Sequence, residues 1–228
     1  MSVRDRLSAV WPFYGLTLTT PRLELKLPTD TDLIDLGSIL RGGIQRPGGA
    51  PFQAPWMYEP APHAERGLLQ SFFNTIAHWD ANDWDLGFAV FFEGRPIGMQ
   101  HITSKSFAAT GCFGSGCWLG LPYQGHGLGT EMGQAILTLG FEWLEAREAY
   151  IGAWADNAAS LRVIDKLGYI SNGQYYQPFG DTVRLDKRLR LPRERWLHTQ
   201  RPPVRITGLE PCLPLLGLPD SHVPMRPS

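Results

Sequence analysis

A short run of glycines between two apolar segments constrains this chain more than any other feature. Residues 118–130 read Trp-Leu-Gly-Leu-Pro-Tyr-Gln-Gly-His-Gly-Leu-Gly-Thr, so Gly125, Gly127 and Gly129 alternate just before the next patterned segment. Pro122 ends the preceding strand because it has no N–H to donate. Glycine has no Cβ, so we expect the backbone here to turn with positive φ and to approach a ligand closely.

A helix over residues 128–146 follows the glycines. One apolar face recurs with a period near 3.6 residues, at Leu128, Met132, Ala135, Ile136, Leu139 and Trp143. The first N–H groups of a helix have no partner within it and can bind an anion such as a diphosphate. A tight turn without a ligand is the simpler alternative.

Other phosphate-binding loops fit these residues less well. A P-loop requires Gly-Lys-Ser/Thr, and residues 129–131 are Gly-Thr-Glu. A dinucleotide loop of the Gly-x-Gly-x-x-Gly type requires glycine where Thr130 stands. A looser variant that includes Gly133 keeps a nucleotide-binding oxidoreductase open as an alternative, although only one strand-helix-strand unit follows the loop.

Composition limits the function classes without selecting one. The 228 residues are 43% hydrophobic, which is enough for a full core, and the net charge of −1 gives no reason to expect nucleic acid. The apolar stretch Leu7–Leu18 contains Pro12 and Gly15 and is too short to span a bilayer. We therefore expect no membrane or nucleic-acid partner, no signal peptide and a cytoplasmic location.

The cysteine pattern does not indicate a disulfide framework. The count is odd, with Cys112, Cys117 and Cys212. Cys112 and Cys117 would lie about 16 Å apart in one strand at roughly 3.3 Å per residue, too far for a bridge. We expect free thiols, and we expect no metal site.

The remaining pattern predicts a mixed sheet with helices on both faces. We expect an N-terminal extension over 1–15, one domain over 16–197 and a proline-rich extension over 198–228, part of which packs while the last ten residues do not. The expected strands are 22–27, 86–92, 96–104, 112–121, 149–155, 170–178 and 182–190, and the expected helices are 31–41, 62–80, 128–146 and 158–167. A Gly/Pro-rich loop is expected at 42–61.

Three segments together resemble one family. The segment from Gln124 to Gly129 matches Gln-x-x-Gly-x-Gly of motif A in the GNAT (GCN5-related) N-acyltransferases, and residues 156–169 match motif B through Asn157, Ser160 and Lys-Leu-Gly-Tyr. Residues 20–25, Thr-Pro-Arg-Leu-Glu-Leu, resemble the opening strand of the RimJ/RimL branch. The resemblance covers about residues 16–197. It implies an α/β (α+β) GNAT fold, with a mixed, mostly antiparallel sheet of about seven strands, helices on both faces and a splayed strand pair at the CoA site.

The resemblance also implies how acyl-CoA binds as cosubstrate. The glycine loop holds the diphosphate, and the strand end holds the pantetheine. Asn157 contacts the donor or only caps its helix, and Arg162 and Lys166 meet the 3′-phosphate or only face solvent. The donor-binding residues expected on this basis are Trp118, Leu119, Leu121, Gln124, Gly125, His126, Gly127, Leu128, Gly129, Thr130, Asn157, Ser160, Arg162 and Lys166.

The proton-transfer groups depart from the family pattern. Ile164 stands where many members have a tyrosine that acts as the acid. The resemblance therefore points to Ser160 as the group that hydrogen-bonds the leaving thiolate. The alternative is that Ser160 is only a residue of the first helical turn, without a role in proton transfer. Phe179 stands where RimL-like enzymes have a glutamate base. His101 and Asp181 are the substitutes, although a core histidine and a turn aspartate account for them equally simply.

The acceptor is expected to be a small-molecule or peptide amine. By the same resemblance it binds between loop 42–61 and the tip of the last hairpin, where Trp56 and Glu59 suit a cation with an apolar neighbour, unless Trp56 only packs on the core. The resemblance implies acetyl-CoA as the default donor, with succinyl-CoA, which an actinobacterial subgroup uses, as an open alternative. A catalytically silent acyl-CoA-binding module is a further alternative, and the apolar ends of the chain make a homo-oligomer possible.

Overall fold

One large sheet organises the molecule. The structure is a computed structural model that describes residues 2–45, 52 and 54–219. Its nine-stranded sheet has the order β7-β8-β6-β5-β4-β3-β2-β1-β9. All neighbouring strands run antiparallel except β5 and β6. The strands are β1 (Thr17–Thr19), β2 (Leu23–Lys26), β3 (Asp83–Phe92), β4 (Arg95–Lys105), β5 (Cys112–Leu119), β6 (Glu148–Trp154), β7 (Ile170–Phe179), β8 (Thr182–Pro192) and β9 (Arg205–Thr207).

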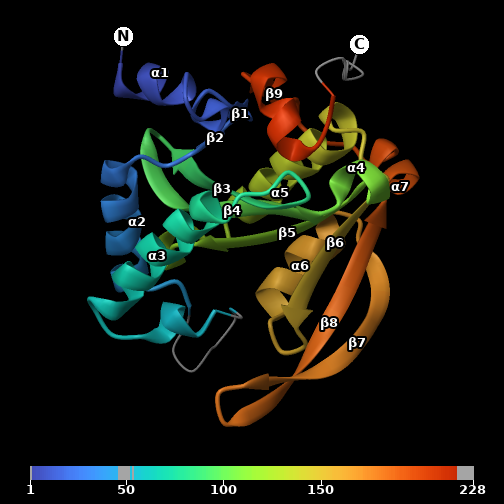
Figure 1. Ribbon diagram of the computed structural model, residues 1–228. Helices are drawn as coiled ribbons and strands as arrows, with labels where there is room; N and C mark the ends of the chain where they lie inside the picture. Colours follow the sequence, from blue (N-terminus) through green and yellow to red (C-terminus); the bar gives the residue numbers. More distant parts are fainter. Residues whose placement is uncertain (1, 46–51, 53, 220–228) are drawn as a thin grey trace.

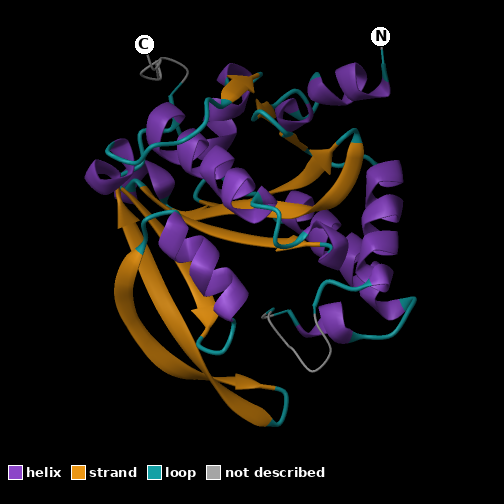
Figure 2. Ribbon diagram, turned by 180° about the vertical axis from the view of Figure 1, so that it is seen from behind, coloured by secondary structure: helices purple, strands orange, loops and turns teal. Residues whose placement is uncertain are grey.

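Helices cover both faces of this sheet. Helices α2 and α3 lie on one face and α5 and α6 on the other (Figures 1 and 2). The helices are α1 (Val3–Ser8), η1 (Pro12–Tyr14), α2 (Asp30–Gly42), η2 (Pro55–Tyr58), α3 (His63–Ala77), α4 (Phe107–Thr110), η3 (Leu121–Tyr123), α5 (Leu128–Thr138), η4 (Leu139–Trp143), α6 (Ala158–Lys166), α7 (Arg193–Leu197) and η5 (Glu210–Leu216). The predicted mixed sheet between two helical layers is confirmed.

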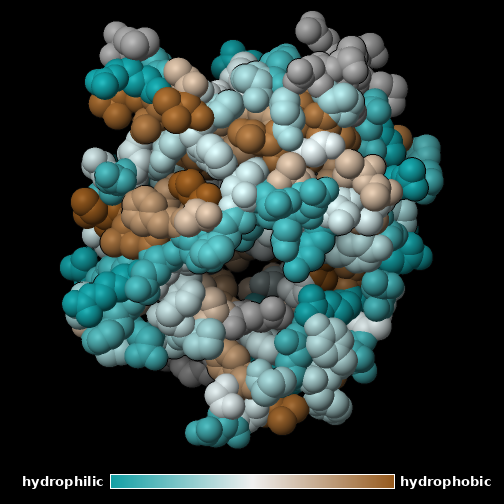
Figure 3. Space-filling model, viewed as in Figure 1, coloured by the Kyte–Doolittle hydropathy of each residue, from teal (hydrophilic) through white to brown (hydrophobic). Residues whose placement is uncertain are grey.

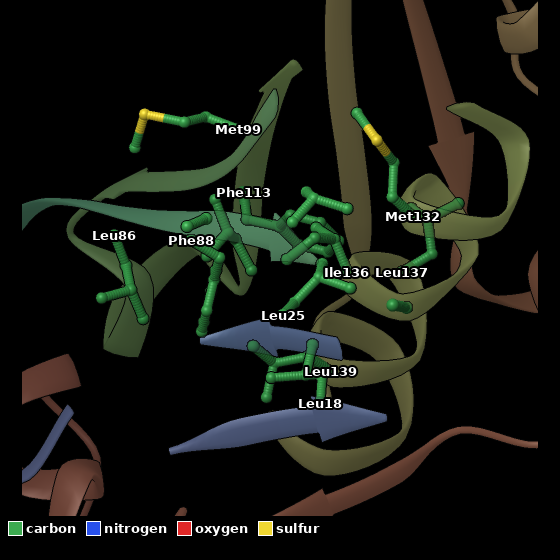
Figure 4. Packing of buried hydrophobic residues seen from close by; sticks show 14 of the residues in the cluster. Leu18, Leu25, Leu86, Phe88, Met99, Phe113, Met132, Ile136, Leu137 and Leu139 are labelled. Atoms are coloured by element: carbon green, nitrogen blue, oxygen red, sulfur yellow. The ribbon is translucent and has the colours of Figure 1, made fainter. Parts of the chain in front are cut away.

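Helix α5 joins the glycine loop to the core. Met132 and Ile136 are fully buried, and Ile136 lies on the side of the helix toward Leu25 and Phe88 of the sheet (Figure 4). The apolar face predicted from the 3.6-residue period is therefore confirmed. The predicted helix 128–146 is not a regular α-helix throughout. Its last part is the π-helical segment η4, and the helical structure ends at Trp143.

The two ends of the chain complete the sheet. The sheet has nine strands where about seven were expected, because the short strands β1 and β9 pair with each other and β1 also pairs with β2. Cys212, Leu213 and Leu216 of η5 are buried, and Trp79 Nε1 donates to the Leu215 carbonyl at 2.9 Å. Part of the C-terminal segment therefore packs as predicted. The prediction that the last ten residues do not pack falls almost entirely on residues 220–228, which lie outside the described residues. The domain boundaries at residues 15 and 197 stay a prediction.

Two features of the described chain bear on the function classes. Across residues 2–45, 52 and 54–219, no helix is long and apolar enough to cross a membrane, and no group of three or more metal-ligating side chains forms. Cys112, Cys117 and Cys212 are free thiols, as predicted.

Candidate functional site

Strands β5 and β6 separate part-way along their length. They pair only where Cys112–Gly114 face Glu148–Tyr150. Beyond this point β5 stays paired with β4 as far as Leu119, and β6 stays paired with β8 as far as Trp154. Within the part of the chain that the structure describes, the facing edges of residues 115–119 and 151–154 therefore have no partner strand in the gap. Backbone N–H and C=O groups on these edges are available to a ligand, except the Leu119 carbonyl, which accepts a hydrogen bond from Gln124 Nε2.

A cavity of about 2000 Å³ occupies this gap. Its lining includes both separated strand ends, the start of α5 and the start of α6. Figure 3 shows the face of the molecule hollowed near its centre. A cavity of this size is larger than most small-molecule sites, so it has room for an extended cosubstrate together with a second reactant.

The glycine loop forms one wall of the cavity with a row of free N–H groups. Gly125 and Gly127 have φ of 84° and 81°, so the expected positive φ is present at two of the three glycines. Gly129 instead lies in the first turn of α5, where no positive φ is needed. Within the described chain, the N–H groups of residues 125–129 donate no hydrogen bond. Free N–H groups at the positive end of a helix dipole are suited to bind an anion, and the predicted diphosphate site at this loop stays a prediction.

All the predicted donor-binding residues line the cavity except His126 and Leu128. Leu128 is buried in the core, and the His126 carbonyl accepts a hydrogen bond from Arg22. Gln124 lines the cavity but has a second task. Its side-chain Nε2 donates to the carbonyls of Ile44 and Leu119 at 2.8 and 2.9 Å, and its backbone N–H donates to Leu121. Gln124 therefore braces the loop, and none of its N–H groups faces an anion.

Asn157 and Ser160 act as a unit at the start of α6. The Ser160 N–H donates to Asn157 Oδ1 at 3.1 Å, which caps the helix and fixes the orientation of the amide. Asn157 Nδ2 then donates to Ser160 Oγ at 2.9 Å. The hydroxyl already accepts this bond, so its proton is free to donate toward the cavity that Ser160 lines. Cap and cavity contact are thus compatible for Asn157.

The family comparison agrees with this geometry. The acetyltransferase (GNAT) domain family matches residues 22–170. The chain belongs to this family. It is an enzyme of the GNAT acetyltransferase type, as the sequence motifs predicted.

Solved structures share the GNAT fold at low sequence identity. Mycobacterium smegmatis RimJ in complex with CoA-disulfide has a TM-score of 0.69 at 17% identity, covering 83% of this chain and 91% of that chain. RimL, the ribosomal L7/L12 alpha-N-protein acetyltransferase, in complex with coenzyme A has a TM-score of 0.62 at 14% identity, covering 76% of this chain and 95% of that chain. A GCN5-related N-acetyltransferase from Brucella melitensis has a TM-score of 0.63 at 17% identity, covering 79% of this chain and 80% of that chain.

The two residues predicted as alternative bases do not line the cavity of this GNAT domain. The His101 ring lies over Gly87 of β3, on the side away from β5, and its Nδ1 is 2.7 Å from Asp85 Oδ1. Burial lowers the pKa of His101, but the Asp85 charge and hydrogen bond outweigh it and raise the pKa above 6.5. Asp181 lies in the exposed turn between β7 and β8. Their predicted role in proton transfer stays a prediction.

The His101–Asp85 pair predicts a pH-dependent stability. Because the pKa of His101 is higher in the fold than in the unfolded chain, its contribution is complete below pH 6.5 and disappears as the pH rises through the raised value. Asp85→Asn should therefore destabilise the protein more at pH 5.5 than at pH 9, as measured by urea unfolding. A difference in unfolding free energy that is the same at both pH values would contradict the pairing.

Two further groups line the gap between β5 and β6. Cys117 lines the cavity and is exposed there, and desolvation by the surrounding protein raises the pKa of its thiol to about 11. The thiol stays protonated at neutral pH, so Cys117 is a poor nucleophile. Tyr169 Oη is 3.5 Å from Ser115 Oγ, and burial raises the pKa of its hydroxyl. Both side chains are therefore neutral where they line the cavity.

The opposite side of the cavity is aromatic and charged. Phe179 at the hairpin tip contacts Tyr58 of η2 and Trp154 of β6, with ring centroids 5.9 and 5.7 Å apart. Arg184 lies over the Trp154 ring at 4.8 Å and binds Asp156 through two bonds of 2.6 and 2.7 Å. The α2–α3 connection and the β7–β8 hairpin thus meet at this side.

Sequence reasoning missed the group that braces the glycine loop from behind. The buried Thr20 and Glu131 and the more exposed Arg22 form a hydrogen-bonded cluster that reaches the His126 carbonyl. The Thr-Pro-Arg segment was noticed only as part of an opening strand. A glutamate on the apolar side of α5, one turn after the loop, is the sequence signal that could have indicated a buried partner.

Proposed function

We propose that this GNAT enzyme transfers an acetyl group from acetyl-CoA to a primary amine, by direct attack in a ternary complex. One observation supports this most strongly: the free N–H row of residues 125–129 and the hydroxyl of Ser160 open onto the same cavity as the unpaired strand edges. The cavity thus offers an anion site, backbone partners for amides and a hydroxyl donor together.

The donor would bind along these groups in order. The N–H groups at the start of α5 hold the diphosphate, and the free edge of residues 115–119 pairs with the pantetheine amides. Arg162 and Lys166 lie one helical turn apart on α6 and line the cavity. A cation at either position can meet the 3′-phosphate of CoA.

Proton transfer to the leaving group would fall to Ser160. Its hydroxyl proton is free for the developing thiolate because Asn157 supplies the hydrogen bond that Ser160 Oγ accepts. The proposal includes no covalent intermediate on Cys117, because the raised pKa keeps that thiol protonated and therefore weakly nucleophilic.

The acceptor would be an amine that loses its proton readily. An α-amine has a pKa of about 8, so a useful fraction is neutral near neutral pH without a strong base. His101 or Asp181 can then act only at a distance, through water, because neither lines the cavity. A peptide N-terminus is therefore the acceptor class that we favour, in line with the RimL enzyme named for alpha-N-protein acetylation.

The charges around the cavity favour acetyl over succinyl. A succinyl carboxylate requires a cationic partner near the thioester. Arg184 and Arg188 line the acceptor side, but Arg184 is paired with Asp156 at 2.6 Å and Arg188 with Asp186 at 2.8 Å. Each positive charge is already compensated, so an added carboxylate gains little.

Thiol release tests this function directly. Purified protein is given acetyl-CoA or succinyl-CoA with N-terminal peptides, lysine peptides, polyamines or aminoglycosides, and free CoA is measured. We expect turnover with acetyl-CoA and a peptide α-amine. Binding of acetyl-CoA in calorimetry without turnover on any amine would indicate a silent binding module, and no binding to folded protein would overturn the proposal.

A further inference from the structure

A buried carboxylate lies directly behind the glycine loop. Glu131, in the first turn of α5, is only 6% exposed. It accepts hydrogen bonds from Thr20 Oγ1 at 2.6 Å, from the Arg22 N–H at 3.0 Å and from Arg22 Nε at 2.7 Å, and Arg22 Nη2 lies 2.6 Å from its Oε2. A buried charge with this many partners is well satisfied, and it fixes the Arg22 guanidinium in one orientation.

The same guanidinium reaches the loop itself. Arg22 Nη1 donates to the His126 carbonyl at 3.1 Å, between the two glycines with positive φ. In a trans peptide the C=O and the following N–H point in opposite directions. Holding the His126 carbonyl toward Arg22 therefore directs the Gly127 N–H away from Arg22, and Gly127 lines the cavity.

The charge on Arg22 matters as well as its hydrogen bonds. The Glu131 carboxylate lies within one helical turn of the N–H groups that face the cavity. An uncompensated negative charge there would oppose a bound diphosphate. Arg22 cancels that charge from the side of the loop away from the Gly127 N–H.

From this geometry we propose that Arg22 is a positioning residue for the diphosphate of the acyl donor. It acts through the His126–Gly127 peptide and through Glu131, and not by touching the reacting atoms. The inference rests on the proposed function, since it names the part of the enzyme that prepares the same anion site. It assigns to the opening strand a role in donor binding.

A donor without a diphosphate separates this role from a general structural one. S-acetylpantetheine carries the same thioester and pantetheine amides as acetyl-CoA. We expect Arg22→Met to lower kcat/KM for acetyl-CoA about 10-fold, through KM, and to leave kcat/KM for S-acetylpantetheine unchanged. Arg22→Lys should restore part of the loss, because one ammonium group cannot satisfy both Glu131 and the His126 carbonyl.

Two further variants keep the test sharp. Arg22→Met leaves Glu131 buried without its cation, so the double variant Arg22→Met with Glu131→Gln removes that charge and protects the fold. It should still lose its preference for acetyl-CoA. Arg41→Met breaks an exposed ion pair with Glu65, 2.9 Å in length and remote from the loop, and should change neither donor.

The possible contrary results point to different errors. If Arg22→Met lost activity equally with both donors, or kept the wild-type preference for acetyl-CoA, the role of Arg22 would be wrong while the diphosphate site stood. Full recovery in the double variant would show that Arg22 only neutralises Glu131. A wild-type enzyme that used both donors equally well would contradict the diphosphate site, and one that used neither donor would contradict the proposed function.

Discussion

Ser160→Ala is expected to lower kcat about 100-fold, with KM for acetyl-CoA changed less than about threefold. The hydroxyl is the group placed to hydrogen-bond the departing thiolate, because its oxygen accepts from Asn157 Nδ2 and its proton points elsewhere. The backbone bond from the Ser160 N–H to Asn157 Oδ1 survives the substitution, so the cap of α6 is kept. Steady-state kinetics of CoA release with a peptide amine would measure both constants.

A matched serine distinguishes chemistry from helix stability. Ser38 lies on α2, where its hydroxyl donates to the Ile34 carbonyl at 3.2 Å, and Ser38→Ala should leave kcat unchanged. If Ser160→Ala kept kcat within about threefold of the wild type, the thiolate would leave without help from Ser160. A change confined to KM would instead indicate that Ser160 only contacts the bound donor.

The parts of the fold that sequence predicts are those with local periodicity. Helix α5 shows a repeating apolar face, and the long strands β3 and β4 are joined by a turn in which Glu93 and Gly94 both have positive φ. Strands β1 and β9 have three residues each, which is too short for any alternation to be recognised. They form because Thr17–Thr19 pair with Arg205–Thr207, two segments that are separated by most of the sequence. No local sequence pattern encodes such a pairing.

The candidate site divides in the same way. The glycine loop was predictable because positive φ restricts the residue type at Gly125 and Gly127. The brace behind it was not, since Arg22 and Glu131 are 109 residues apart and each reads as an ordinary charged residue. His101 illustrates the converse. Its residue type suggested a base, but Gly87 on the neighbouring strand leaves room for the ring to turn toward Asp85.

Gly127→Ala is expected to raise KM for acetyl-CoA about 100-fold, with a smaller effect on kcat. Gly127 has φ of 81°, which costs a residue with a Cβ roughly 1–2 kcal/mol. The added Cβ would also lie 3.4 Å from Arg22 Nη2, against the cluster that holds the His126 carbonyl. Relief of the backbone strain or of the contact with Arg22 would turn the Gly127 N–H away from the ligand. Each hydrogen bond to a charged phosphate contributes about 1.5–3 kcal/mol to binding. Calorimetric titration with CoA would measure the loss independently of turnover.

Backbone strain alone must be separated from the loss of the anion site. Gly94 has φ of 76° in the β3–β4 turn with nothing within 4 Å of an added Cβ, so Gly94→Ala introduces a comparable strain far from the cavity. Gly125, with φ of 84° and equally open surroundings, tests strain inside the loop without a contact to Arg22. We expect the affinity for CoA to fall in the order Gly94→Ala, Gly125→Ala, Gly127→Ala. If Gly127→Ala lost stability like Gly94→Ala but bound CoA as tightly as the wild type, the N–H groups at the start of α5 would not be the diphosphate site.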